Sequence, residues 1–273
     1  LVLGGQAMAA DLSARMPLKA AVAVPRYYSW TGCHVGGHIG AGWGNAQFSE
    51  PLEPAGQYVM PAGSSEGVDK GAGFLGGVGL GCDYQFASNW VIGAAGDFSW
   101  ADIHGSQNVA DPFFNAKSGS SIQLTAKTEW LATATMRLGY AWDRFMLYGK
   151  GGAAWSHDKY SIQNLAFFGN PNSTFCANAA LTTITACNPS GATTRLGWTL
   201  GLGLEWAFAD NWSANVEFDH YDFGSRNVML TDQTGVTFVP VLAHVPASGP
   251  FSIKDRTEAV KVGVSYRFWT GGH

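Results

Sequence analysis

Three histidines and one serine are the residues of this chain whose types could support nucleophilic or acid–base chemistry. His104, His157 and His220 fall near the same end of their predicted strands, and Ser156 directly precedes His157. A nucleophile needs a base within hydrogen-bonding reach, and the base needs a polar group that orients it. Successive side chains of a β-strand point to opposite faces, so Ser156 and His157 cannot form such a pair directly. We therefore interpret these histidines as rim residues and predict that the chain is not an enzyme.

A glycine motif could indicate a nucleotide cofactor. Residues 71–76 fit the pattern G-x-G-x-x-G. That function requires the amino terminus of a helix directly after the motif, but the pattern that follows is that of a β-strand. We therefore predict no cofactor and no metal site. The net charge of −4 is unfavourable for nucleic acid, so no nucleic-acid partner is expected.

Ten ionisable side chains occupy alternate positions of the predicted strands, opposite the apolar face. Five are carboxylates, four are permanent cations and one is a histidine, so their charges nearly cancel. Charges that are removed from water need partners of opposite sign. We therefore predict an internal network that fills the space enclosed by the strands. The ten residues are His38, Asp83, Asp97, Arg137, Lys150, Glu205, Glu217, Asp219, Lys261 and Arg267.

The turns predict how this network is arranged. A hairpin that closes with Trp142 opposite Phe145 places Arg137 opposite Lys150. These two cations would repel each other, and we expect Glu217 to reach them from another strand. Counting residues from the turns places nine of these side chains at three successive heights inside the barrel. The lowest contains Asp83, Glu205 and Arg267, the middle one Arg137, Lys150 and Glu217, and the highest Asp97, Asp219 and Lys261.

Four cysteines in a chain with features of export suggest disulfide bonds. Cys176 and Cys187 lie close together in one predicted loop, and we expect them to pair. In the first predicted hairpin, Cys33 and Cys82 fall opposite each other on the outer face. We expect these two residues to be neighbours, while the pattern leaves open whether they are bonded.

The clearest element that could position these residues is a strand predicted over residues 257–268. Small residues and isolated charges such as Lys261 and Arg267 alternate there with apolar residues. The apolar face carries Val260, Val262, Val264, Tyr266 and Phe268. A narrow polar interior with an apolar exterior is typical of a membrane β-barrel rather than of a soluble sheet.

Seven further segments show the same alternation. They are residues 31–43, 71–86, 90–104, 128–142, 145–160, 193–208 and 212–224. Short turns alternate with long polar segments at residues 44–70, 105–127, 161–192 and 225–254. The sequence therefore predicts an all-β fold, an eight-stranded antiparallel transmembrane β-barrel with short periplasmic turns and four long external loops. Closure leaves no unpaired strand edge in lipid.

Aromatic spacing gives an independent measure of the span. Trp90 and Trp100 are ten residues apart on one face, as are Phe145 and Trp155. At ~3.3 Å per residue and ~40° of tilt, this spacing corresponds to about 25 Å, the height of the apolar band of an outer-membrane barrel. We predict two aromatic girdles that include Trp43, Trp90, Trp100, Trp130, Trp142, Trp155, Trp198, Trp206 and Trp212.

The composition and the chain ends bound the domain organisation. The 273 residues are 46% apolar and 13% charged, with 36 glycines, which is unlike a soluble α/β enzyme. No apolar run is long enough for a transmembrane helix. Ala7-Met8-Ala9 has the form of a signal-peptide cleavage site. We expect a residual signal peptide at 1–9, a periplasmic lead-in at 10–29, the barrel at 30–269 and a tail at 270–273.

The chain resembles the outer-membrane immunogenic protein family of alphaproteobacteria, which are small opacity-type barrels. The resemblance rests on eight strands, on Trp30-Thr31-Gly32, on Gly36-Gly37 and on the ending Tyr266-Arg267-Phe268. Cys33, Cys82 and the residues after Phe268 depart from the family pattern. The resemblance implies a bacterial outer-membrane location, surface exposure, antigenicity and a contribution to envelope integrity, without shared catalytic chemistry. The ending also resembles the β-signal of the outer-membrane assembly machinery, through Lys261, Gly263, Tyr266 and Phe268.

These observations favour a structural or interaction barrel with a plugged lumen, because eight strands leave an interior that side chains can fill. A passive small-solute porin is the alternative, and a lipid A-modifying barrel enzyme is a third. The expected partners are outer-membrane lipid and lipopolysaccharide, the assembly machinery during insertion, and a protein partner or a second copy at the loops.

Overall fold

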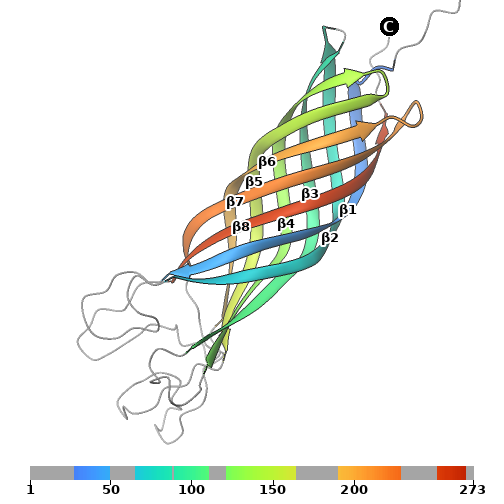
Figure 1. The fold of residues 1–273 in the computed structure, drawn as a ribbon. Coiled ribbons are helices and arrows are strands. Elements are labelled where there is room, and N and C mark those ends of the chain that lie inside the picture. The colour runs from blue at the N-terminus through green and yellow to red at the C-terminus, as the bar shows by residue number, and fades with distance from the viewer. Residues whose placement is uncertain are drawn as a thin grey trace, which may run out of the picture.

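The chain folds as a closed β-barrel. The computed structural model describes residues 28–49, 65–87, 89–110, 121–163, 190–228 and 251–268. Each strand pairs antiparallel with the next, and the last strand pairs with the first (Figure 1), which confirms the predicted eight-stranded fold. No helix in the described residues is long and apolar enough to cross a membrane. The strands are β1 (Gly32–Ser49), β2 (Ser65–Phe86), β3 (Trp90–Ala110), β4 (Ser121–Trp142), β5 (Phe145–Gln163), β6 (Ser190–Trp206), β7 (Trp212–Val228) and β8 (Phe251–Arg267).

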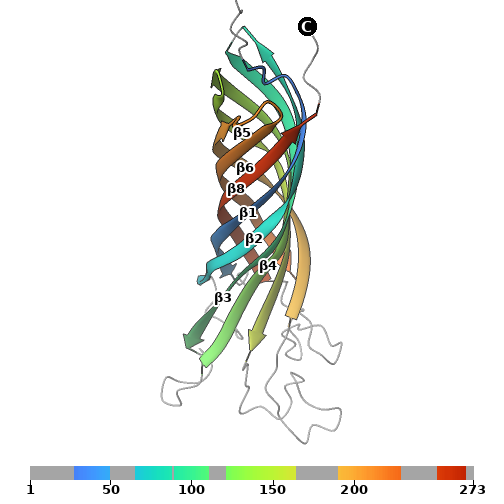
Figure 2. The ribbon, with the colours of Figure 1, turned by 90° about the vertical axis from the view of Figure 1, so that its right-hand side faces the viewer.

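Three short turns lie at one end of the barrel, which we call the turn end; the opposite end is the loop end. Figure 2 shows the strands winding steeply around the long axis between the two ends. The β2–β3 turn contains Ala87 at φ 48°, and the β4–β5 turn contains Asp143 at φ 56°. Trp142 is opposite Phe145, as predicted. This register fixes which residues of the neighbouring strands face the interior together.

The strands extend farther toward the loop end than the sequence pattern predicts. β1 continues to Ser49, although a loop is predicted over residues 44–70. The two faces exchange polarity in this extension, because Ala46 and Phe48 are buried inside whereas Gln47 faces outward. The prediction relied on an apolar outer face, so it ended each strand where that face becomes polar. The same correction applies to the loops predicted at residues 105–127, 161–192 and 225–254.

Two apolar layers cross the interior. The layer at the turn end, which we call the floor, is centred on the fully buried Trp30, against which Tyr28 packs from the predicted lead-in. The floor consists of Trp30, Val91, Ala141, Met146 and Ala207, and Tyr148 continues this apolar cluster toward the interior. A second layer lies closer to the loop end and consists of Leu75, Ile103, Leu131, Ala154, Tyr221, Phe223 and Ala259. Charged residues such as Asp83 and Lys261 lie between these two apolar layers.

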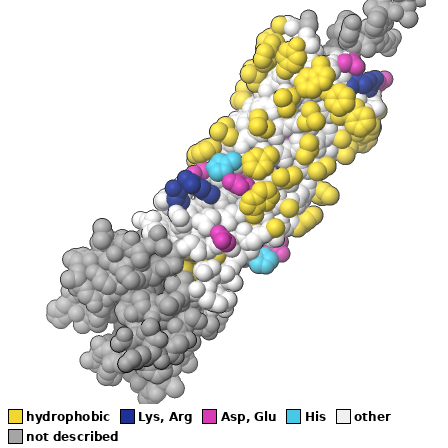
Figure 3. All heavy atoms as spheres, in the orientation of Figure 1, with side chains coloured by type: hydrophobic (Ala, Val, Ile, Leu, Met, Phe, Trp, Pro, Cys, Tyr) yellow, Lys and Arg dark blue, Asp and Glu magenta, His cyan; other side chains and the backbone are white. Residues whose placement is uncertain are grey.

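The outer wall of the barrel is apolar. Leu80, Phe74 and Leu202 are more than 60% exposed, and Figure 3 shows hydrophobic side chains along the wall with charged side chains gathered toward its ends. The nine tryptophans of the predicted girdles lie on this outer face. Near the turn end Trp206 stacks on Phe145, and toward the loop end Trp130 stacks on Phe98. This wall suits contact with lipid rather than with water.

Cys33 and Cys82 form a disulfide bond between β1 and β2. The two residues are directly opposite each other, with Cα atoms 4.0 Å apart. The predicted proximity is therefore confirmed, and the open question of bonding is answered. Cys176 and Cys187 lie outside the described residues.

Inward-facing glycines allow β1 to approach β8 closely. A Cβ atom at Gly40 would collide with the carbonyl oxygen of Val260. Gly37 faces outward on the same strand, and a Cβ atom there would lie 3.7 Å from the carbonyl oxygen of Gly77, which is an ordinary contact. The space between β1 and β8 therefore requires glycine at position 40 but not at position 37.

We expect Gly40→Ala to lower the free energy of unfolding by about 1–3 kcal/mol, because the added methyl group must displace the β8 backbone. Gly37→Ala serves as the matched control and should leave stability nearly unchanged. Urea unfolding in detergent micelles, followed by tryptophan fluorescence, measures both. Equal effects of the two substitutions would contradict the close approach.

We also expect loss of the Cys33–Cys82 bond to destabilise the barrel. Its sequence separation of 49 residues corresponds to about 4 kcal/mol in the chain-entropy description of disulfides. The measurement compares unfolding midpoints with and without reductant in a Cys176→Ala/Cys187→Ala background, so that only this bond is reduced. When Cys33→Ala and Cys82→Ala are added to this background, the unfolding midpoint should be the same with and without reductant.

Candidate functional site

The interior near the turn end contains a layer of alternating charges, which we call the lower cluster. It consists of Asp83 on β2, Arg137 on β4, Glu205 on β6 and Arg267 on β8. The four residues come from alternate strands, so negative and positive side chains follow each other around the barrel. All four are less than 7% exposed. Each charge therefore has neighbours of opposite sign on both sides.

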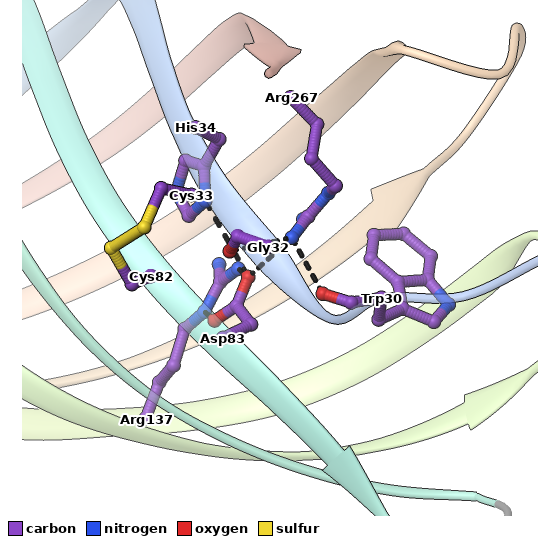
Figure 4. Close-up of a disulfide and its surroundings, with 8 residues drawn as sticks. All are labelled: Trp30, Gly32, Cys33, His34, Cys82, Asp83, Arg137 and Arg267. Atoms are coloured by element: carbon purple, nitrogen blue, oxygen red, sulfur yellow. Dashed lines mark hydrogen bonds and ion pairs between the residues drawn. A yellow bond between two sulfur atoms is a disulfide. The ribbon is translucent and has the colours of Figure 1, made fainter. Parts of the chain in front are cut away.

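The contacts within the lower cluster join opposite walls of the barrel. Arg137 Nε donates to Asp83 Oδ1 at 2.6 Å, and Arg137 Nη1 lies 3.1 Å from Glu205 Oε2. Arg267 Nη1 lies 3.0 Å from Asp83 Oδ2, as Figure 4 shows. Ser213 Oγ donates to Glu205 Oε1 at 2.7 Å. Bonds of this kind to ionised groups are among the strongest in proteins.

Arg267 also holds the floor in place. Its Nη1 donates to the carbonyl oxygen of Trp30 at 2.6 Å, and its guanidinium carbon lies 5.4 Å from the centre of the Trp30 ring. Trp30 Nε1 donates to the carbonyl oxygen of Asp143 in the β4–β5 turn at 3.0 Å. The indole is thus fixed next to the lower cluster, and Figure 4 shows Trp30 beside Arg267.

A second group of charges, the upper cluster, lies farther along the axis. Lys150 Nζ is 2.6 Å from Glu217 Oε2 and 3.0 Å from Asp219 Oδ1. Lys261 Nζ is 2.7 Å from Asp219 Oδ2 and 3.0 Å from Asp97 Oδ1. Asp219 therefore joins the two lysines, and β3, β5, β7 and β8 are connected across the interior.

The expected role of Glu217 is correct for Lys150 and wrong for Arg137. Arg137 is opposite Lys150 in the register, as predicted. The ring of Tyr148, however, lies between the clusters, with the guanidinium of Arg137 5.1 Å from the ring centre and the phenol hydroxyl donating to Glu217. Arg137 therefore extends toward the turn end and belongs to the lower cluster rather than to the predicted middle height.

A polar cavity of about 70 Å³ lies between the two clusters, and His34, His38, Tyr148 and Asn215 are among its lining residues. The ring of His38 forms a 2.7 Å hydrogen bond to Ser99 Oγ rather than an ion pair with a described residue. His34 Nδ1 lies 3.4 Å from Asp83 Oδ2. The cavity has room for a few water molecules.

A third group of buried charges, the outer cluster, was not predicted. Lys70 Nζ lies 2.7 Å from Asp255 Oδ2 and 3.7 Å from Asp158 Oδ1, and Tyr160 donates to Asp255 Oδ2 at 2.6 Å. The fully buried Arg195 donates to the carbonyl oxygen of Ile253 at 2.8 Å. Lys70 lies in a segment that was interpreted as a loop, and Asp255 lies just before the strand predicted over residues 257–268, whereas Asp158 and Arg195 lie within predicted strands. Strand alternation could have identified three of them, since Asp158 shares the inward-facing parity of Lys150, Arg195 that of Glu205 and Asp255 that of Lys261.

The rim histidines do not assemble a nucleophilic site. Ser156 Oγ donates to Asp158 Oδ2 inside the barrel at 2.6 Å, while His157 stacks on Trp130 on the outer face. His220 lies 3.4 Å from Glu258 on the outer face, and the half-exposed His104 lies 3.4 Å from Asp102. The described residues contain no group of three or more His, Cys, Asp or Glu arranged to hold a metal ion.

The residues of the assembly-signal resemblance lie on both faces of β8. Lys261 is buried in the upper cluster, whereas Tyr266 and Phe268 are 40% and 59% exposed on the outer wall. Gly263 is opposite His38 of β1 and Asn215 of β7.

Comparison with known proteins identifies relatives over most of the chain. The "31 kDa outer-membrane immunogenic protein" of Brucella melitensis is 30% identical over 263 residues, which cover 96% of this chain and 93% of that protein. The "25 kDa outer-membrane immunogenic protein" of Brucella abortus is 26% identical over 274 residues, with 98% and 93% covered. Among solved structures, the outer membrane protein OprG from Pseudomonas aeruginosa is similar at 14% identity and a TM-score of 0.43, with 88% of this chain and 97% of that chain covered.

The sequence profile of the family described as "Outer membrane protein beta-barrel domain" matches residues 14–268. The match includes all eight strands, from Gly32 to Arg267. The closed antiparallel barrel and its apolar outer wall agree with that description. The chain belongs to the outer-membrane protein β-barrel family, and its place is the bacterial outer membrane.

Proposed function

We propose that this protein is a non-enzymatic structural and interaction barrel whose lumen is closed by its own side chains. The observation that carries the proposal is the lower cluster, in which four buried charges of alternating sign connect β2, β4, β6 and β8. An eight-stranded barrel has an interior just wide enough for side chains to fill. Ion pairs across such an interior occupy the space that a solute would need.

The layers on either side of the charges support the same proposal. Trp30 is fully buried in the floor at the turn end, which faces the periplasm in barrels of this kind. Toward the loop end, the apolar layer around Leu75 and Ile103 follows the upper cluster. The cavity of about 70 Å³ lies between these layers, and it is far smaller than a sugar-conducting channel. These features favour a plug over the alternative, a passive porin.

The contacts of the protein would then be made by its surface. Two relatives are named as immunogenic outer-membrane proteins, and we propose that this chain likewise presents its loop end as an antigenic or partner-binding surface that contributes to envelope integrity. The outward Tyr266 and Phe268 suit recognition by the assembly machinery during insertion. A lipid A-modifying activity has less support, because Ser156 and His157 point to opposite faces.

Purified protein in planar lipid bilayers should show little conductance, because the clusters and the floor leave no continuous path wide enough for sugars. Liposome swelling with small sugars provides a second measurement. A steady, large and ohmic conductance from the unmodified protein would favour the porin instead.

Glu217→Ala should lower the free energy of unfolding by about 3–5 kcal/mol, because Lys150 is left buried beside fewer carboxylates. The same variant should raise the ion leak in bilayers. Asp210→Ala is the matched control, since the Asp210 side chain is 88% exposed in its pair with Arg144 and exposed pairs contribute about 0–1 kcal/mol. Denaturant unfolding of both variants distinguishes an internal network from ordinary surface charge.

A further inference from the structure

The outer faces of β3, β4 and β5 carry the same order of side-chain types beyond their tryptophans. The cross-strand register aligns these side chains in three rows. The first row is basic, the second carries hydroxyl groups and the third carries amides. The rows are His104, Lys127 and Lys159, then Ser106, Thr125 and Ser161, then Asn108, Gln123 and Gln163.

The basic row is unusual because like charges lie side by side. Lys127 is directly opposite Lys159, an arrangement that is unfavourable on a sheet surface without compensation. Compensation comes from the membrane side, where Lys127 Nζ lies 2.8 Å from Asp102 Oδ1 and Lys159 Nζ lies 2.7 Å from Glu129 Oε1. The two lysine side chains are still 42% and 55% exposed. Each ammonium group has three N–H donors, so donors remain for a ligand.

Among the described residues, the acidic side chains next to this surface lie on its membrane side. Outward of the basic row, the described strand residues 105–110, 121–126 and 160–163 contain neither aspartate nor glutamate. Within these strand residues, an approaching anion therefore meets the lysines without a carboxylate farther out. The hydroxyl and amide rows can both donate and accept hydrogen bonds, which complements the hydroxyl groups of a sugar.

The surface also lies at the right height. Trp100 is opposite Trp130, and His157 stacks on Trp130 with 5.8 Å between the ring centres. Tryptophans of this kind flank the apolar band of the bilayer. The basic row follows four residues beyond Trp100 and Trp155, which at ~3.3 Å per residue and ~40° of tilt is about 10 Å farther out.

We propose that this surface binds the headgroup of a phosphorylated glycolipid in the outer leaflet. The phosphate contacts Lys127 and Lys159, with His104 beside them, and the sugar lies against the hydroxyl and amide rows. The acyl chains pack on Trp100 and Trp130. Each part of the surface then has a complementary group in such a lipid, namely the acyl chains, the phosphate and the sugar hydroxyl groups.

The other cations at this level are arranged differently. Arg256 and Lys254 lie on the single strand β8, and their neighbours on β1 are the neutral Asn45 and Gln47. Arg256 pairs with Asp222 at 2.9 Å. Among the described residues on the outer face beyond the tryptophans, only β3 to β5 present bases directly opposite one another on neighbouring strands, so Lys254 provides a matched control.

The test uses the folded full chain in detergent micelles and three probes. They are an acylated bisphosphorylated glucosamine disaccharide, its dephosphorylated counterpart and phosphatidylglycerol. Binding is followed by tryptophan fluorescence and by native mass spectrometry. The unmodified protein should prefer the bisphosphorylated glycolipid, and Lys127→Gln/Lys159→Gln should weaken its binding about 30-fold. Lys254→Gln should change it by less than about twofold, and all variants should keep the electrophoretic mobility of the folded barrel.

A further variant separates sugar recognition from charge. Gln123→Ala/Gln163→Ala should reduce the preference for the glycolipid over phosphatidylglycerol while leaving phosphatidylglycerol binding unchanged. The proposal is overturned if the double lysine variant binds like the unmodified protein, or if Lys254→Gln weakens binding equally, which would indicate non-specific attraction. Equal binding of the dephosphorylated lipid would exclude the phosphate site, and equal binding of phosphatidylglycerol would exclude the sugar surface. None of these outcomes depends on whether the lumen conducts.

Discussion

A charge inside an eight-stranded barrel has no bulk water to hydrate it, and the rest of this structure depends on that constraint. The protein meets it by taking opposite charges from alternate strands. Asp83 and Glu205 face Arg137 and Arg267 in one layer, and Lys150 and Lys261 share Asp219 in another. A buried ion pair contributes less to stability than its contacts suggest, because both partners lose hydration. Its clearest effect here is to fix which walls of the barrel face each other.

Separation of the charged layers is as important as their pairing. Tyr148 turns one face toward Arg137 and its hydroxyl toward Glu217, so each cluster keeps its own set of partners. Trp30 bounds the lower cluster, and the apolar layer that includes Tyr221 follows the upper one. Beyond that layer the outer cluster repeats the principle with Lys70 and Asp255. The interior is therefore organised in layers, as expected when inward residues come from alternate strands.

Strand alternation made most of this fold predictable. A side-chain period of two assigns each residue to a face, and the tight β4–β5 turn fixes the register in which Arg137 faces Lys150. The facing of Cys33 and Cys82 followed from the pairing expected for the first two strands. The strand extensions could not be predicted from this alternation. Beyond the lipid the outer face of a strand becomes polar, as at Gln47, and the inner face becomes apolar, as at Phe48. The partners of Arg137 could not be predicted either, because they depend on the direction that its long side chain takes past the ring of Tyr148.

The bond between Arg267 and Trp30 has a consequence for the order of folding. Its two residues are 237 positions apart, one before the first strand and the other at the end of the last. Their contact can form only when β1 and β8 have met, whereas hairpins such as β4–β5 need no such meeting. Until then the clusters remain open to solvent at the turn end and keep their hydration. Dehydration of the interior is therefore a late event, and an unfinished barrel stays wet inside.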